Sequence, residues 1–360
     1  MKQRIKKEKK PIKTIYSTAP IRVNDIGGWT DTWFSGEGKV LNMGVSPLVE
    51  VRIDVFENEK RKEDRVLVHA ENYGDTFLVS PENPDYKVHP LLQGAINSLP
   101  IPKELELEIS LSSHVPAGCS TGTSASVCVA LLGGLDFLLP RRHSLDEIVA
   151  LAHGVETEKL GLQSGIQDQI CAAYGGVCFI HMHSYPKANV LKLELEEILK
   201  RDLNRRLFLI YLGKAHSSSA LHEEVIAFLE RKGSQFKIIQ ELRDLAERAK
   251  DLLLKGDLDS FGKVMIENNE CQRSLHPGLI SEEADAVIEI AKKYKASGWK
   301  VNGAGGKGGS LTILAAQEAG LRKSMLQEIN SLKRGIKSIP ISLAFSGLEV
   351  KEGIKSSSKS

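Results

Sequence analysis

The segment HVPAGCSTGTSASV, residues His114–Val127, joins a strand pattern to a helix pattern. Before it, ELELEISLS over residues 104–112 alternates apolar and polar side chains, as a half-buried strand does. After it, SASVCVALLGGLDFLL is apolar on nearly every side and predicts a buried helix. A strand, a glycine loop and a helix in this order direct free backbone N–H groups and a helix dipole at one point, and such points bind anions. The segment therefore predicts a phosphate-binding loop.

This loop is not a P-loop, because it lacks the G-x-x-x-x-G-K-[ST] pattern and contains no lysine or arginine. Gly118 and Gly122 free the backbone to turn its amides inward, and amides with a helix terminus can bind an anion without a lysine. A tight turn without any ligand is the alternative for such a loop taken alone. The hydroxyls of this loop favour a phosphate site over a turn without a ligand, since a hydroxyl at a helix start beside phosphates can also ligate Mg²⁺. They belong to Ser120, Thr121, Thr123, Ser124 and Ser126.

The length of 360 residues predicts two domains that share a cleft, since domains usually span about 100 to 200 residues. The net charge is +2, and residues 1–13 alone contribute +6, so the remainder carries −4. This negative body argues against nucleic-acid binding, and we expect the basic segment to be a disordered solvated tail. The longest apolar run, near residues 127–132, is far too short for a membrane span.

The five cysteines are odd in number and form no C-x-x-C pair, which argues against both a metal site and a disulfide framework. Most lie among apolar or small residues, where thiols act as small hydrophobes in a reducing compartment. The basic tail also lacks the apolar region of a signal peptide. We therefore expect a cytoplasmic protein.

The rest of the chain alternates strand and helix patterns. Strand patterns fill residues 14–79, a proline-rich linker follows, and Ser144 with Glu147 has the capping-box spacing that begins a helix. Residues 195–206 are a candidate domain boundary. Beyond it the patterns predict a strand over 205–213, a helical stretch over 218–255, a helix over 281–298, a strand over 310–316, a helix over 320–333 and a strand over 339–345.

Two carboxylates are candidates for chemistry. Val149, Ala152 and Glu156 lie at i, i+3 and i+7, so Glu156 projects from the inward face of a helix. An internal ion pair with an arginine is the alternative for a buried glutamate. Asp168 follows Gly165 in the first turn of a short helix, where the dipole favours its ionised form. It could deprotonate a hydroxyl in phosphoryl transfer, or it could be an ordinary helix-start aspartate.

Two further segments carry candidate residues. In IRVNDIGGWTDTW, residues 21–33, Arg22 could supply a fixed cation, and Asn24 and Asp31 could bond sugar hydroxyls; a plain turn is the alternative. VNGAGGKGGSLTIL, residues 301–314, contains G-x-G-x-x-G, but these glycines lead into a strand rather than a helix. That order excludes a dinucleotide fingerprint and favours a hairpin whose tip approaches a ligand or another backbone.

Taken together, these segments resemble the GHMP kinases, which lack the Walker P-loop and carry three ordered motifs. APIRVNDIGGWTDTW is similar to their substrate motif, PAGCSTGTSAS to their P-x-x-x-G-x-G-S-S-A motif, and VNGAGGKGGSLTIL to their C-terminal glycine motif. With SGIQDQICAAYGG the resemblance covers about residues 14–348. The loop departs from the family at Ser120 and Thr121, where Gly-Leu is usual. Gly28–Asp31 reads GWTD where galactokinases read EHTD, and is more similar to L-fucose and heptose 7-phosphate kinases.

The resemblance implies an α+β, two-domain GHMP kinase fold, with a ribosomal protein S5 domain 2-like N-terminal domain and a ferredoxin-like C-terminal domain. The implied boundaries are a basic tail over 1–13, domains over 14–200 and 201–350, and a polar tail over 351–360.

The resemblance also implies an ATP- and Mg²⁺-dependent kinase that phosphorylates the anomeric hydroxyl of a sugar or sugar phosphate and makes a sugar 1-phosphate. A sensor without catalysis, or a kinase for another acceptor such as galactose, is the alternative, and the oligomeric state stays open. The implied catalytic residues are Asp168 and Arg22, and Ser124 and Glu156 would hold Mg²⁺. ATP would bind Pro116, Ala117, Gly118, Cys119, Ser120, Thr121, Gly122, Thr123 and Ser124, and the acceptor would bind Asn24, Asp31, Gly305 and Gly306.

Overall fold

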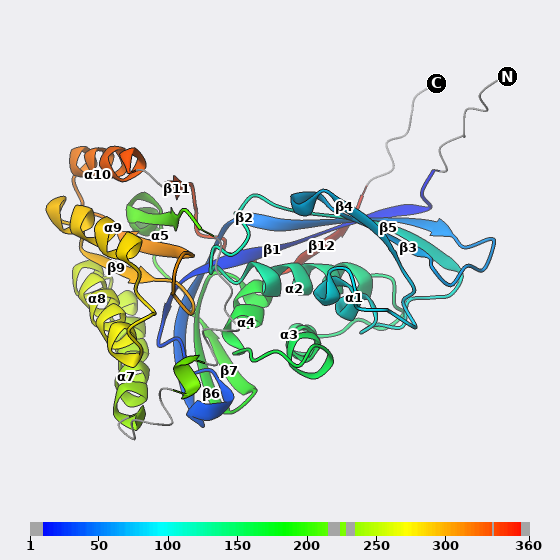
Figure 1. Ribbon diagram of the computed structural model, residues 1–360, viewed down its shortest axis with the longest axis horizontal. Coiled ribbons are helices and arrows are strands. Elements are labelled where there is room, and N and C mark those ends of the chain that lie inside the picture. Colours follow the sequence, from blue (N-terminus) through cyan, green and yellow to red (C-terminus); the bar gives the residue numbers. More distant parts are fainter. Residues whose placement is uncertain (1–9, 215–223, 228–234, 333–334, 354–360) are drawn as a thin grey trace.

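The computed structural model describes residues 10–214, 224–227, 235–332 and 335–353. Four expectations fall wholly or partly outside these residues. They are the basic tail over residues 1–9, the helical stretch over 218–255 at residues 218–223 and 228–234, the end of the helix predicted over 320–333, and the end of the polar tail over 354–360. The described chain forms two sheets with helices packed on each (Figure 1).

The larger sheet has the strand order β12-β1-β2-β5-β3-β4, and β6 joins it through β2. Its long strand β2 serves two sets of partners: Gly38–Met43 pairs with β6, and Val49–Glu57 pairs with β5. The pairing of β3 with β5 is parallel, whereas the other strand pairs of this sheet are antiparallel. The strands are β1 (Lys13–Ile26), β2 (Gly38–Glu57), β3 (Val66–Ala70), β4 (Asp75–Val79), β5 (Leu105–Ser113), β6 (Val177–Ser184), β7 (Lys187–Lys192) and β12 (Glu349–Glu352).

Helices α1 to α4 lie on one face of the larger sheet (Figure 1). Helix α2 is buried on nearly every side, as predicted, and each large apolar side chain that it buries contributes roughly 1.5–3 kcal/mol. The predicted capping box is present, since Ser144 accepts from the Glu147 N–H and the Glu147 side chain accepts from the Ser144 N–H. The helices are α1 (Pro90–Ile96), α2 (Thr123–Asp136), α3 (Leu145–Gly154) and α4 (Gln167–Tyr174), and short 3-10 turns occupy Trp33–Ser35 and Glu71–Tyr73.

The smaller sheet is antiparallel with the order β11-β8-β10-β9, and it buries its own apolar cluster against the helices beside it. Its strands are β8 (Leu207–Leu212), β9 (Gly298–Val301), β10 (Ser310–Leu314) and β11 (Ile336–Ile339). The helices of this half are α5 (Glu197–Arg206), α7 (Gln235–Leu254), α8 (Leu258–Leu275), α9 (Glu282–Lys293) and α10 (Ala319–Ser331).

One predicted strand is wrong, and the expected boundaries stay predictions. The candidate boundary over residues 195–206 is largely the helix α5, which runs directly into β8. The strand predicted over 339–345 ends at Ile339, because Pro340 cannot donate a ladder hydrogen bond. Beyond it the chain returns to the larger sheet as β12 beside β1, so the implied domain end at residue 350 divides a strand.

A buried ion pair joins the two sheets where β1 ends. Lys300 Nζ on β9 lies 3.0 Å from Asp25 Oδ1 on β1, and each side chain is only 1% exposed. Burial alone would raise the pKa of the Asp25 carboxyl, but the charges of Lys300 and Arg22 hold it below its usual value. The N–H of Gly303 also donates to both carboxylate oxygens at 3.1 Å. This pair fixes the glycine turn after β9 against the end of β1.

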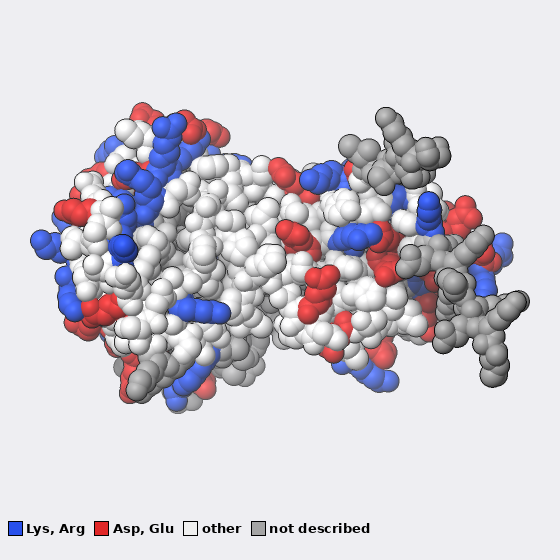
Figure 2. Space-filling view, turned by 90° about the horizontal axis from the view of Figure 1, so that it is seen from above, with Lys and Arg blue, Asp and Glu red and all other residues white. Residues whose placement is uncertain are grey.

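None of the helices in the described part of the chain is long and apolar enough to cross a membrane. On the face drawn in Figure 2, positive and negative side chains are interspersed at both ends, and a band of uncharged surface lies between them.

Replacing Lys300 by Met tests the buried pair. The substitution leaves the Asp25 carboxylate uncompensated in the interior, so we expect the free energy of unfolding to fall by about 3–5 kcal/mol in urea titrations. The double variant Asp25→Asn/Lys300→Met should recover much of this loss, because neither member of the pair is then left as an unpaired buried charge. As a control, Lys293→Met breaks a surface pair with Glu328 and should cost less than about 1 kcal/mol. A Lys300→Met loss no larger than the control's would contradict the assignment.

Candidate active site

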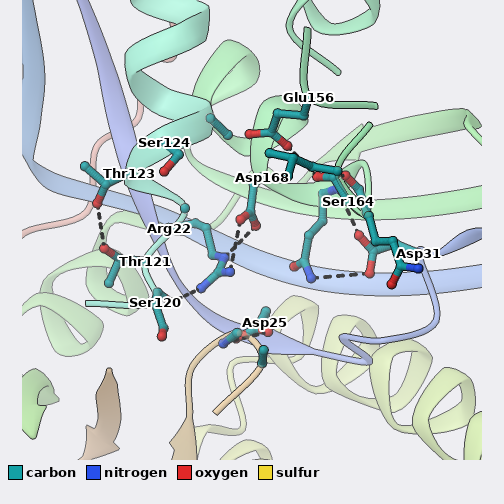
Figure 3. Close-up of a pocket in the computed structure, with 18 of the residues that line it drawn as sticks. Arg22, Asp25, Asp31, Ser120, Thr121, Thr123, Ser124, Glu156, Ser164 and Asp168 are labelled. Carbon is teal, nitrogen blue, oxygen red and sulfur yellow. Dashed lines mark hydrogen bonds and ion pairs between the residues drawn. The ribbon is translucent and has the colours of Figure 1, made fainter. Parts of the chain in front are cut away.

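A cavity of about 410 Å³ lies where the predicted motifs meet. Its wall is built by the end of β1, the loop before α2, the first turn of α2, the segment before α4, and the glycine turn after β9. In Figure 3 the loop residues stand on one side of Asp168, and Asp31 with Ser164 stands on the other. Segments that are far apart in the sequence thus form one site.

Three consecutive carbonyls of the loop are bonded to other elements. The Cys119 carbonyl accepts from Ser310 Oγ at 2.6 Å, the Ser120 carbonyl accepts from Arg22 Nη1, and the Thr121 carbonyl accepts from the Arg22 peptide N–H at 2.9 Å. Ser120 adopts φ +57°, a left-handed conformation that is uncommon outside glycine. These carbonyl contacts bind the loop backbone from Cys119 to Thr121 to β1 and β10.

The first turn of α2 presents free backbone donors to the cavity. The first backbone bond of this helix runs from the Ser126 N–H to the Gly122 carbonyl, and no side chain caps the helix start. The N–H groups of Thr123, Ser124 and Ala125 precede that bond, and all three residues line the cavity. No acidic residue occupies this turn, so the helix terminus offers a positive end to an anion.

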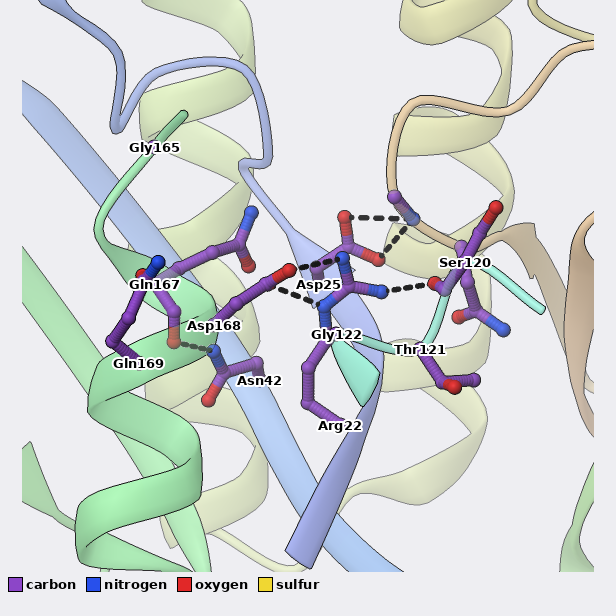
Figure 4. A network of polar contacts seen from close by, with 12 residues as sticks. Arg22, Asp25, Asn42, Ser120, Thr121, Gly122, Gly165, Gln167, Asp168 and Gln169 are labelled. Carbon is purple, nitrogen blue, oxygen red and sulfur yellow. Dashed lines mark hydrogen bonds and ion pairs between the residues drawn. The ribbon is translucent and has the colours of Figure 1, made fainter. Parts of the chain in front are cut away.

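Arg22 connects the loop to Asp168. Its Nε lies 2.7 Å from Asp168 Oδ1, its Nη2 lies 3.1 Å from Asp168 Oδ2, and its Nη1 donates to the Ser120 carbonyl (Figure 4). Burial opposes the charge, yet Asp168 and Asp25 raise the pKa of Arg22 above its usual value. The guanidinium therefore stays charged and holds the Asp168 carboxylate by two parallel bonds.

Glycine is required where Asp168 approaches the loop. Gly122 has φ +67°, and a Cβ on it would lie 3.0 Å from Asp168 Cγ and 3.2 Å from Arg22 Cγ. Any side chain here would push the carboxylate away from the start of α2. Asp168 itself stands in the first turn of α4, as predicted, and its side chain is 27% exposed.

Glu156 is buried, as predicted, but an arginine is not its partner in the described structure. It lies in a π-helical turn, Val155–Lys159, that continues α3. Its Oε2 accepts from Ser164 Oγ at 2.5 Å and from Gln169 Nε2 at 2.9 Å. Burial raises the pKa of the Glu156 carboxyl to about 7. Ser124 also lines the cavity, and in Figure 3 its hydroxyl and the Glu156 carboxylate both lie above Asp168.

Asp31 supplies a carboxylate at the other end of the cavity. Its Oδ2 accepts from the Gln167 N–H at 3.1 Å, and its Oδ1 accepts from Gln167 Nε2 at 3.4 Å. A Cβ on Gly165 would lie 2.2 Å from Asp31 Oδ2, so the backbone crosses the carboxylate closely. Burial is the largest cause of a pKa of about 6 for this carboxyl, and the charge of Asp168 adds to it.

Several predicted residues do not line the cavity. Asn24 is fully buried beneath the site, where its N–H donates to Asn302 Oδ1 at 2.9 Å. The Gly306 N–H donates to the Leu279 carbonyl at 2.8 Å, and Gly305 packs against the same carbonyl. Of the glycine turn, Gly303 and Ala304 reach the wall. The predicted hairpin tip thus approaches another backbone. Pro116 and Ala117, of the phosphate loop, do not line the cavity either.

The sequence reading missed two groups. One is Asp25 with Lys300; a lysine inside the apolar strand pattern GWKV was the available signal. The other is a chain of contacts behind Glu156, in which His153 Nε2 lies 2.8 Å from the Tyr185 hydroxyl and that hydroxyl donates to the Ser164 carbonyl at 2.8 Å. No local pattern marks these contacts. They hold the segment at Ser164 and Gly165, in which Ser164 bonds Glu156 and Gly165 lies against Asp31.

Family models match both halves of the chain. The model for the GHMP kinases N terminal domain matches residues 90–176, which include the loop and Asp168. The model for the GHMP kinases C terminal domain matches residues 249–328, which include the glycine turn.

The following relatives and solved structure are each 28% identical to this chain or less. A bifunctional fucokinase/GDP-fucose pyrophosphorylase of Arabidopsis thaliana is 28% identical over 334 residues, 86% of this chain, but the match spans only 30% of that protein. A mevalonate kinase of Methanocaldococcus jannaschii is 28% identical over 239 residues, 66% of this chain and 70% of that protein. The crystal structure of a D-glycero-D-manno-heptose 1-phosphate kinase from Bacteroides thetaiotaomicron has a TM-score of 0.73 at 20% identity, covering 95% of this chain and 100% of that one. This last likeness shows the fold.

The raised pKa of Glu156 has a consequence for stability in the ligand-free protein. A folded-state pKa near 7 means that the carboxyl contributes its full stability below its unfolded pKa near 4.5 and loses it as the pH rises through 7. Glu156→Gln removes this ionisation. We expect the unfolding free energy of the variant, relative to wild type, to rise by about 2–3 kcal/mol between pH 5 and pH 8 in urea titrations without nucleotide or divalent cations. A difference that does not change with pH would contradict the assignment.

Proposed function

Because the chain belongs to the GHMP kinase family, we propose that it transfers the γ-phosphate of ATP to the anomeric hydroxyl of a sugar and releases a sugar 1-phosphate. One observation carries the proposal. Arg22 holds the Asp168 carboxylate in the same cavity as an anion-binding helix start on one side and the buried Asp31 carboxylate on the other. A donor phosphate and an acceptor hydroxyl would meet at Asp168.

The phosphates of ATP fit the loop side. Backbone N–H groups at the start of α2 and the positive end of its dipole would bind phosphate oxygens, with the hydroxyls of Thr123 and Ser124 beside them. A lysine is not needed for this, because Arg22 already supplies a fixed charge next to the loop. The loop from Gly118 to Ser124 is thus the proposed triphosphate site.

Ser124 and Glu156 would hold Mg²⁺. Their hydroxyl and carboxylate oxygens are the hard donors that Mg²⁺ prefers, and this ion usually takes one or two protein ligands, with phosphates and waters completing its shell. A buried carboxyl whose pKa is raised to about 7 also fits, because a cation beside it restores the ionised form. When bound, the ion neutralises charge on the β- and γ-phosphates.

Asp168 would orient the acceptor hydroxyl and take its proton. As the hydroxyl oxygen bonds to the γ-phosphorus, the bond from that phosphorus to the β,γ-bridging oxygen breaks and ADP leaves with the electron pair. Arg22 would keep the carboxylate anionic and aimed, and its charge would stabilise the charge that develops on the transferring group.

Asp31 would bind hydroxyls of the sugar at the far end of the cavity. The names of the relatives point to fucose and to a heptose phosphate as acceptors, and GGWTD at residues 27–31 supports that branch. Mevalonate and galactose are the other acceptors to be assayed beside these sugars, because mevalonate kinases and a galactokinase are also similar to this chain.

An ADP-release assay with ATP and Mg²⁺ tests the proposal across L-fucose, heptose phosphates, galactose, arabinose and mevalonate. We expect saturable, acceptor-dependent ADP release with at least one sugar, and a sugar phosphate as product. Binding of nucleotide and sugar without any turnover would instead identify a sensor on this fold and would overturn the proposal.

Asp168→Asn tests the role of the carboxylate. Loss of the base and of its charge should lower kcat by several powers of ten, with binding of nucleotide retained. The matched control is Asp251→Asn, which changes a half-exposed aspartate on α7 outside the cavity and should leave kcat unchanged. An Asp168→Asn enzyme that keeps more than about a tenth of the wild-type kcat would remove Asp168 from the mechanism.

A further inference from the structure

The loop between β1 and β2, residues 27–37, forms part of the cavity wall. Trp29, Asp31 and Thr32 of this loop line the cavity, and we call residues 27–37 the acceptor loop. Trp29 has φ +78°, an outlier for a bulky side chain, and such a conformation persists only where the surrounding structure holds it. The position of Asp31 therefore depends on the contacts that hold this strained backbone.

Helix α7 of the second half supplies apolar contacts behind the start of the acceptor loop. A Cβ on Gly27 would lie 2.8 Å from Ala246 Cβ and 3.2 Å from the Leu242 carbonyl oxygen. Leu242 also packs in the apolar cluster that contains Trp29. Because Leu242 and Ala246 stand at i and i+4, they lie on one face of α7, and this face meets the loop.

Arg243, beside Leu242 on α7, bonds the other end of the acceptor loop. Its Nη2 donates to the Ser35 carbonyl at 2.6 Å and to Ser35 Oγ at 3.2 Å. Ser35 is buried and is the last residue of the 3-10 turn that follows Thr32. Its hydroxyl donates to the Glu37 carbonyl at 2.5 Å. One guanidinium thereby fixes the turn that comes directly after the cavity-lining residues.

Two further bonds hold this region independently of Arg243. At the start of the acceptor loop, the Gly27 N–H donates to Asn268 Oδ1 on α8 at 2.8 Å. Just beyond its end, Lys39 Nζ lies 2.8 Å from Glu247 Oε2 on α7. Loss of the Arg243 side chain would therefore free the turn before β2 and leave the chain attached on both sides of it.

Arg243 lies apart from the nucleotide side of the site. It does not line the cavity, and it bonds Ser35 and Gln240. The loop before α2 is instead bonded to Arg22 on β1 and to Ser310 on β10. A change at Arg243 should thus reach the acceptor loop without moving the proposed phosphate site.

We propose that Arg243 is a positioning residue for the acceptor. Through the Ser35 carbonyl it holds the strained segment from Trp29 to Thr32 in the cavity wall, so that a helix of the second half sets the affinity for the acceptor. This inference rests on the proposed kinase function and adds to it a residue outside the cavity. It predicts a loss of acceptor binding that nucleotide binding does not share.

Arg243→Met tests the inference in steady-state assays of ADP release, with ATP, Mg²⁺ and the acceptor of highest turnover. We expect the KM for the acceptor to rise about fivefold or more, with kcat and the KM for ATP within about twofold of wild type. The retained KM for ATP also shows that the variant folds. Arg243→Lys keeps a cationic donor and should return the acceptor KM to within about twofold of wild type.

The matched control is Arg248→Met, which removes an exposed arginine of α7 that pairs with Glu267 and should change neither KM. An acceptor KM that stays at the wild-type value in Arg243→Met, or an equal rise in both KM values, would overturn the inference and leave the kinase function standing. No transfer by the wild-type protein to any acceptor would overturn the kinase function itself, and the inference with it.

A double-mutant cycle asks whether Arg243 acts through the loop that carries Asp31. Asp31→Asn, Arg243→Met and the double variant are compared by kcat/KM for the acceptor. We expect the loss in the double variant to be about threefold or more smaller than the product of the two single losses, because both substitutions disturb the same loop. Losses that multiply in full would show that Arg243 acts elsewhere and would overturn the inference.

Discussion

The site depends on the pairing of one buried arginine. Arg22 is only 5% exposed, and a guanidinium in that position is stable only when its donors are satisfied. Two of its nitrogens bond Asp168 on α4, and the third bonds the Ser120 carbonyl of the phosphate loop. A single side chain on β1 thereby fixes the distance between the proposed base and the proposed phosphate site, which is the geometry that phosphoryl transfer requires.

A second set of buried contacts supports this arrangement from the smaller sheet. Lys300 and the Gly303 N–H both bond Asp25, and Ser310 Oγ bonds the Cys119 carbonyl of the loop. The glycines after β9 allow this close approach, since a Cβ on Gly309 would lie 2.6 Å from Ser120 Oγ. The C-terminal glycine motif therefore acts by supporting the loop, and the two halves of the chain form one site.

Local patterns were enough to predict the parts of the site but not its long-range pairs. Alternation identified β5, spacing identified the cap of α3, and the order strand, loop, helix identified the loop before α2 that lines the cavity, because each of these signals lies within one short segment. Asp25 and Lys300 are 275 residues apart, so no periodicity could link them. Asn24 and Gly306 belong to family-like motifs, yet neither lines the cavity, since a motif does not tell which of its residues face it. Asn24 is fully buried, and the Gly306 N–H is bonded to the Leu279 carbonyl. The short β11 and the return of the chain as β12 likewise depend on pairing with distant strands.

The activity proposed for this cavity is phosphorylation of the anomeric hydroxyl of a sugar. The most direct measurement is ³¹P and ¹H NMR of the purified product formed from ATP and the sugar acceptor with the highest turnover. The account predicts one sugar phosphate whose phosphorus couples to the anomeric proton. A phosphorus coupled to any other sugar proton, or the release of inorganic phosphate with the sugar unchanged, would contradict it.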